Sequence, residues 1–290
     1  MIDLHCHVLP GIDDGPSTLE GSLALARAAQ AAGIDTLVAT PHVSSHYPND
    51  PDTIARLVDE LNAHLLEQEV SLEVLPGAEL AITHIPQIEP SQLSRLGLGG
   101  GRWLLVEPPF APIVPGLEGM LLALLEQGHS VVLAHPERCA AFHRDPRMLE
   151  TLVDAGALLS ITAGSLAGRF GEQARRFALE LARKGMIHNV TSDAHDSVKR
   201  PPGMTEGIGR ARLAPLADWL TEEVPAAILR GEQIPPRPAT RLANGPAWRA
   251  WLHRRQHVSA SNELRHSDDH SDQNEQHNRH LQPDPRRRHR

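Results

Sequence analysis

Histidines and carboxylates follow several short apolar runs in this chain, and these residue types bind divalent metal ions. The chain opens with MIDLHCHVLPGIDDGP, in which His5 and His7 flank a cysteine and Asp14 follows soon after. Residues two apart in a strand point to the same side, so both imidazoles would share one face. A single H-x-H pair is weak evidence for a metal site, because such pairs are more often structural.

The later runs strengthen this interpretation, because they too end in potential ligands. The relevant stretches are ATPH, PGAE, VEPP, AHPER and SDAH. A structural core would not gather so many ionisable groups, since buried charges need partners or metal ions. We therefore predict a metal site built from His5, His7, Asp14, His42, Glu79, Glu107, His135, Asp193 and His195.

The ligand types restrict the metal. Imidazoles and carboxylates without a thiolate suit Mn²⁺, Zn²⁺, Fe²⁺ or Co²⁺. Nine ligands exceed the needs of one ion, so we expect two or three. Arg138 in HPER and Arg200 in DSVKRPP could bind phosphate oxygens beside these ions, although an ordinary ion pair is the alternative for each.

Seven strand-like runs alternate with helical stretches over the first two thirds of the chain. Most runs are short, rich in Val, Ile and Leu, and lack alternation, which is typical of strands covered on both faces. A capping box at Ser17 and Glu20 predicts a helix that closes at Gly33. Four further helices are expected near 52–68, 116–127, 146–155 and 170–184.

This alternation predicts an α/β fold, specifically a distorted (β/α)7 barrel, with an open doubly wound sheet as the alternative. In a parallel barrel the carboxyl ends of the strands share one face, which would bring the distant ligands together. The barrel domain is expected over residues 1–253. The polar, His- and Arg-rich segment 254–290 is expected to be a disordered tail.

Composition limits the partners. The formal net charge of −8 offers no basic field for nucleic acid, and the two cysteines cannot form a disulfide framework. The sequence contains no signal peptide and no apolar run long enough for a membrane span. We therefore expect a cytoplasmic protein without direct membrane insertion.

The motifs IDLHCHVLPGIDDGP, ATPH, PGAE, AHPER, TAGSLAGRFG and SDAH together resemble the PHP superfamily of metal-dependent phosphoesterases. Within it they are most similar to the CpsB/CapC branch of bacterial protein-tyrosine phosphatases, which work in capsule or exopolysaccharide production. The resemblance covers roughly residues 1–230. It implies hydrolysis of phosphotyrosine on a partner protein, such as a membrane-associated tyrosine kinase.

The resemblance also implies how the nine residues divide among three ions, with Mn²⁺ as the usual metal. His5, His7, Glu79 and Asp193 would hold one ion. Glu79 would bridge to a second ion held by Glu107 and His135. Asp14, His42 and His195 would hold the third, and Arg138 and Arg200 match the phosphate-binding arginines.

Two other functions remain open on sequence grounds, and a third is disfavoured. One is a histidinol-phosphate phosphatase or another small-molecule phosphatase with the same metal core. The second is a non-catalytic regulator that binds a phosphorylated partner. A nuclease is disfavoured, because no basic stripe with interleaved aromatic residues runs along the body of the sequence.

A thiol mechanism is disfavoured too. The His-Cys-x₅-Arg loop of thiol phosphatases would need an arginine where Ile12 stands. Cys139 precedes Arg144 by one residue too few. We therefore interpret both cysteines as small packing residues. The metal site, which would activate a water molecule, remains the predicted site of hydrolysis.

Overall fold

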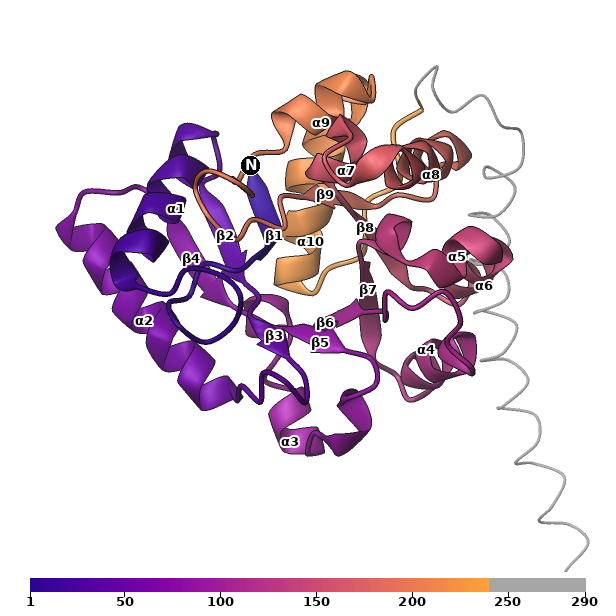
Figure 1. Ribbon diagram of the computed structural model, residues 1–290, viewed down its shortest axis with the longest axis horizontal. Coiled ribbons are helices and arrows are strands. Elements are labelled where there is room, and N and C mark those ends of the chain that lie inside the picture. Colours follow the sequence, from indigo (N-terminus) through magenta and orange to yellow (C-terminus); the bar gives the residue numbers. More distant parts are fainter. Residues whose placement is uncertain (240–290) are drawn as a thin grey trace, which may run out of the picture. The chain divides into compact units, whose positions relative to one another are not determined.

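The computed structural model describes residues 1–239, and within them short parallel strands alternate with helices (Figure 1). The strands are β1 (Ile2–Cys6), β2 (Thr36–Ala39), β3 (His42–Val43), β4 (Glu73–Pro76), β5 (Glu79–Ala81), β6 (Trp103–Glu107), β7 (Ser130–Ala134), β8 (Leu158–Thr162) and β9 (Asn189–Thr191). The helices are α1 (Leu19–Ala31), α2 (Pro51–Glu67), α3 (Pro90–Leu93), α4 (Leu117–Glu126), α5 (Ala140–Arg144), α6 (Arg147–Asp154), α7 (Ala163–Ala167), α8 (Gly171–Lys184), α9 (Thr205–Arg210) and α10 (Val224–Arg230).

The strands form two parallel sheets, one in the order β1-β2-β4 and one in the order β3-β5-β6-β7-β8-β9. The α/β class with parallel pairing is therefore confirmed, whereas a single closed barrel is not established by these pairings alone. Backbone bonds also run from His7 N to Ala194 O and from Asp193 N to His5 O, both at 2.9 Å. These bonds bring the chain after β9 beside the carboxyl end of β1.

Two of the predicted runs contain a break. Pro41 interrupts the run from β2 to β3, because proline has no N–H for the ladder. Gly77 lies between β4 and β5, where a Cβ atom would approach Val38 Cγ1 to 2.8 Å. Gly77 thus permits the segment between β4 and β5 to pass close to β2. After this break, β5 begins at Glu79.

Helices cover the outer faces of the strands. Helices α1 and α2 lie outside β2 and β4, and α4 packs near β7 (Figure 1). The four helices expected at 52–68, 116–127, 146–155 and 170–184 are confirmed as α2, α4, α6 and α8. Most strand residues are buried and many of them are aliphatic, which explains why the strands lack hydrophobic alternation.

The predicted capping box on α1 is wrong by one residue. Thr18, not Ser17, has the extended N-cap backbone, and its Oγ1 accepts a hydrogen bond from Gly21 N at 3.3 Å. Glu20 therefore does not occupy the position of a capping box. The predicted end is confirmed, because Gly33 has φ of 80° and the amides of Gly33 and Ile34 bond back to carbonyls of α1.

Within residues 1–239, no helix is long and apolar enough to cross a membrane. The predicted domain boundary near 253 and the predicted tail over 254–290 lie outside the described residues.

Candidate metal centre

The carboxyl ends of the parallel strands bring all nine predicted ligands close together. They come from β1, β3, β5, β6, the turn after β7, and the segments after β1 and β9. Their nitrogen and oxygen atoms form four groups within 4.8 Å: His7, Asp14, His42 and His195; His5, His7 and Asp193; His5, Glu79 and His135; and His42, Glu79 and Glu107.

Glu79 lies at the centre of the cluster. Its Oε1 lies 2.8 Å from His135 Nε2, and its Oε2 lies 3.2 Å from His5 Nε2, 3.3 Å from His7 Nε2 and 3.1 Å from His42 Nδ1. Burial raises the pKa of this carboxyl, but the charge of His5 and the surrounding hydrogen bonds outweigh burial and hold it well below its usual value. Glu79 therefore remains an anion that several imidazoles share.

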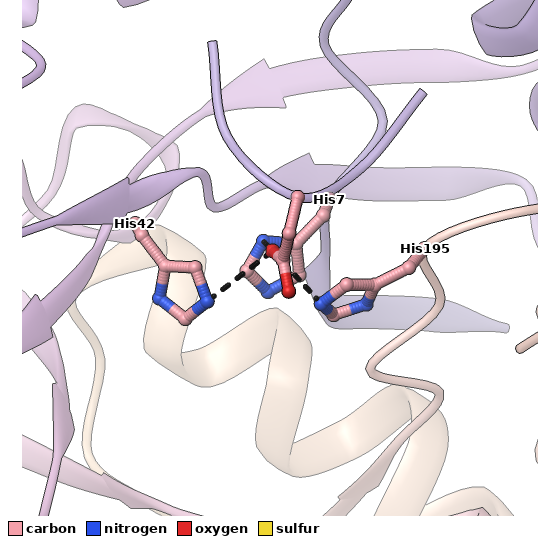
Figure 2. Close-up of side chains that lie close together, drawn as sticks. His7, His42 and His195 are labelled. Atoms are coloured by element: carbon pink, nitrogen blue, oxygen red, sulfur yellow. Dashed lines mark ion pairs between the residues drawn. The ribbon is translucent and has the colours of Figure 1, made fainter. Parts of the chain in front are cut away.

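Asp14 covers another side of the cluster. Its Oδ1 lies 3.3 Å from His195 Nε2 and 3.4 Å from His42 Nε2. Figure 2 shows the rings of His7, His42 and His195 gathered around one point, with dashed lines marking ion pairs. Hydrogen bonds from His195 and His42 hold the pKa of Asp14 far below its usual value.

Asp193 is almost fully buried, with 2% of its side chain exposed. Burial raises its pKa, but the charges of His5, His135 and Arg200 outweigh burial and lower the pKa to about 2. Glu107 differs, because burial and the nearby charge of Glu79 raise its pKa. The carboxylates of the cluster therefore lie close enough for their charges to interact, and a divalent cation would bring further positive charge to them.

The donor set fits a metal ion on chemical grounds. Nε2 of His5 and Nε2 of His7 lie 3.2 Å apart, and only one of them can donate in that contact. Glu79 Oε2 faces three imidazoles yet accepts no well-aligned hydrogen bond. A cation would use these lone pairs together, whereas protons cannot satisfy them all.

Two of the cluster residues have an unusual backbone. His135 and Asp193 have φ of 30° and 51°, and within residues 1–239 only Glu69 and Arg212 are other non-glycine residues with positive φ. Such conformations cost free energy and persist where the surrounding structure imposes them, often at functional sites. The bend at His135 starts the turn that carries Arg138, whose amide bonds to His135 O at 2.9 Å.

Both predicted arginines reach the cluster through Asp193. Arg138 Nη1 donates to Asp193 Oδ2 at 2.6 Å, and Arg200 Nη2 contacts the same oxygen at 2.8 Å. The guanidinium carbon of Arg138 lies over the rings of Phe110 and Phe170, at 5.0 and 4.3 Å from their centres. Both arginines thus form ion pairs with Asp193 in this structure. Phosphate binding by the two arginines stays a prediction.

Comparison with known proteins places these residues in a family. A model of the family described as capsular polysaccharide synthesis, CpsB/CapC, matches residues 1–213. The chain belongs to the CpsB/CapC family. The resemblance expected from the sequence motifs is therefore confirmed.

Two curated CpsB/CapC relatives are similar over most of their length. Tyrosine-protein phosphatase YwqE of Bacillus subtilis (strain 168) is 40% identical over 197 residues, which cover 68% of this chain and 78% of YwqE. CapC of Staphylococcus aureus is 32% identical over 204 residues, which cover 69% of this chain and 79% of CapC.

A solved structure agrees. It belongs to a study of YwqE from Bacillus subtilis and CpsB from Streptococcus pneumoniae, described as metal-dependent tyrosine phosphatases. The match has a TM-score of 0.73 and 36% identity, and it covers 83% of this chain and all of the solved one.

The sequence motifs of this CpsB/CapC chain did not indicate Asp13, which contacts the outer ring nitrogen of His7. Its Oδ2 lies 2.7 Å from His7 Nδ1 and accepts a hydrogen bond from His42 N at 3.2 Å, while its Oδ1 accepts from Gly15 N at 2.9 Å. The doublet of Asp13 and Asp14 in IDDG was the available signal. Nothing in the doublet tells which acid faces the cluster centre and which lies behind His7.

We expect Asp13→Asn to weaken metal binding without unfolding the protein. Asparagine keeps the volume of Asp13 but loses the charge that fixes the ring of His7, and loss of such an outer partner typically costs about 10–100-fold in metal affinity. Titration calorimetry of Mn²⁺ into metal-stripped protein measures this. Asp59→Asn on the exposed face of α2 is the control, and equal affinity of the two variants would contradict the orienting role of Asp13.

Neither cysteine has the properties of a nucleophile. Cys6 and Cys139 are fully buried, and burial raises the pKa of both thiols. Cys6 Sγ contacts Ala194 O at 3.6 Å, and Cys139 Sγ contacts Pro109 O at 3.2 Å. Both thiols therefore remain protonated packing groups near neutral pH.

We expect Cys6→Ser to retain kcat/KM within a factor of about three, because a serine hydroxyl can donate to the same carbonyl. Steady-state kinetics on an aryl phosphate measures this, with Cys139→Ser assayed in parallel. Loss of turnover in Cys6→Ser with metal content unchanged would restore the thiol mechanism.

Proposed function

We propose that this chain is a metal-dependent phosphatase that hydrolyses phosphotyrosine on a partner protein. The observation that carries the proposal is the convergence of nine imidazole and carboxylate side chains with two arginines at one edge of the strands. The named activity of YwqE and the description of the solved relatives support the same substrate class. They do not favour a histidinol-phosphate phosphatase or a non-catalytic regulator.

The four ligand groups support two or three ions, with Mn²⁺ as the proposed metal and Zn²⁺, Fe²⁺ or Co²⁺ as alternatives. The contact of His5 and His7 with Glu79 and Asp193 supports one ion site. The position of Glu79 beside His135 and Glu107 supports a bridging role toward a second. Asp14, His42 and His195 support a third.

Ions held there would supply an activated water molecule and positive charge for the transferring phosphoryl group. Arg138 and Arg200, which both contact Asp193 Oδ2, would donate hydrogen bonds to phosphate oxygens. A phenolate leaves readily because the pKa of phenol is about 10, so no strong general acid is required. The buried thiols take no part.

We also infer that the two sheets form one seven-stranded barrel, in which β2 with β3 and β4 with β5 are single interrupted strands. The pairing orders support this, since each break occupies only two residues. The backbone bonds between His5, His7 and the segment 193–194 support closure between β1 and β9. The face where the ligands gather would then be the face that carries the chemistry of parallel barrels.

The substrate protein is proposed to be a membrane-associated tyrosine kinase of capsule or exopolysaccharide synthesis. Tyr47 is the only tyrosine of this chain, so the phosphotyrosine would belong to a partner. The family description supports the pathway. The net charge of −8 supports the expectation that nucleic acid is not a partner, and we expect the reaction to take place in the cytoplasm.

A substrate comparison tests the proposal. Metal-stripped protein is resupplied with Mn²⁺ and assayed on a phosphotyrosyl peptide, a phosphoseryl peptide and histidinol phosphate. We expect kcat/KM for the phosphotyrosyl peptide to exceed the others at least about tenfold. Preference for histidinol phosphate would establish a small-molecule phosphatase, and tight peptide binding without hydrolysis would establish a regulator.

A further inference from the structure

The side chain of Phe110 is exposed although it lies beside the candidate metal centre. It follows Glu107 by three positions in the segment after β6, and 47% of its surface is exposed. Within residues 1–239, the other large hydrophobic side chains with such exposure are Leu66, Ile113 and Val198. An exposed phenylalanine that borders a reaction site offers apolar area that a ligand can cover.

The contacts of Phe110 fix its ring against two residues of the site. The ring stacks on His135 with centres 5.5 Å apart and planes 16° apart. The guanidinium carbon of Arg138 lies 5.0 Å from the centre of the same ring. Phe110 therefore touches both a proposed metal ligand and the arginine proposed to bind phosphate.

This position matches the place of the leaving group. In an aryl phosphate a single oxygen joins the ring to phosphorus, so the ring begins immediately beyond the phosphate. A phosphate held by Arg138 would bring that ring within reach of the aromatic side chain that packs on Arg138. Two aromatic rings attract each other beyond the effect of area alone, whereas the short chain of an alkyl phosphate has no such partner.

We propose that Phe110 contacts the phenyl ring of the substrate and selects aryl over alkyl phosphate monoesters, an inference that rests on the proposed phosphotyrosine activity. Phe110 keeps surface that a ligand can cover, because 47% of the residue is exposed beside His135 and Arg138. Phe110 would thus be a specificity residue, and the hydrolysis itself would not depend on it.

The test compares a probe with a ring and a probe without one. In Mn²⁺-supplied protein, we expect Phe110→Ala to raise KM for phenyl phosphate about tenfold while kcat stays near the wild-type value. The inhibition constant of inorganic phosphate should remain unchanged, because it has no ring. The KM of Phe110→Leu for phenyl phosphate should lie between the values of the wild type and Phe110→Ala. Leu66→Ala on α2 is the matched exposed control.

Two outcomes would overturn the inference. If Phe110→Ala weakens phenyl phosphate and inorganic phosphate equally, Phe110 acts only by holding Arg138. If the ring-selective loss appears instead in Tyr47→Ala, the aryl contact belongs to Tyr47, whose ring stacks on His42 at 5.6 Å.

Failure of the proposed function is a separate result. A wild-type protein that hydrolyses phenyl phosphate but no phosphotyrosyl peptide would refute the peptide substrate and leave the Phe110 comparison valid. If the wild type hydrolyses no monoester, calorimetric affinities for phenyl phosphate and inorganic phosphate replace the kinetics. An unchanged ratio of these affinities in Phe110→Ala then rejects the role of Phe110.

Discussion

Replacing Glu79 by glutamine is expected to remove bound metal and to lower kcat/KM by about 10³-fold or more. The carboxylate is 1% exposed, and its two oxygens face four imidazole nitrogens, which come from β1, the segment after β1, β3 and the turn after β7. Glutamine keeps the size of the side chain but removes its negative charge and replaces one oxygen with an NH₂ group, which cannot bind a cation. No neighbouring acid has the same reach, so the loss should not be compensated.

Metal content by mass spectrometry and kinetics on a phosphotyrosyl peptide measure the two effects together. Glu73→Gln is the matched control, because Glu73 lies in β4 and is exposed. We expect that variant to resemble the wild type. Wild-type turnover in Glu79→Gln would exclude Glu79 as a shared ligand, and retained metal with lost turnover would restrict its role to the chemical step.

Sequence reasoning predicted the elements well where local chemistry decides them. The runs of Val, Ile and Leu became strands because they are buried on both faces, and Gly33 ended α1 because its backbone has positive φ. The interruption between β2 and β3 could also have been anticipated from Pro41. Thr18 shows the limit, because two adjacent residues can both cap a helix and only the chain path selects one.

The candidate site was predictable as a set of ligands but not as a network. All nine residues come together, since strand ends in a parallel sheet share an edge. The shared Asp193 partner of Arg138 and Arg200 was not predictable, because Arg138 lies 55 residues away in sequence. The roles of Asp13 and Phe110 could not be predicted for a related reason. Both roles depend on the direction of a side chain outside the strands, and the periodicity of the sequence does not determine that direction.

The second large effect is expected at Arg138. We expect Arg138→Ala to lower kcat/KM by about 10²–10³-fold, since it removes a donor aimed at the place where charge develops. Arg138→Lys should restore little, because an ammonium lacks the planar, forked donor geometry of a guanidinium. Arg200→Ala should cost only about tenfold, because its side chain is more exposed than that of Arg138, at 30% against 19%.

Kinetics on a phosphotyrosyl peptide measures the loss of activity, and the inhibition constant of inorganic phosphate shows whether phosphate binding is weakened. The metal content of Arg138→Ala should stay at the wild-type level. Arg147→Ala is the control, since Arg147 is 83% exposed and pairs only with Asp145 among the described residues. Loss of metal in Arg138→Ala would mean that Arg138 serves mainly to position Asp193. A larger effect at Arg200 than at Arg138 would reverse the proposed order, because Arg200 would then be the main contact of the phosphate in the transition state.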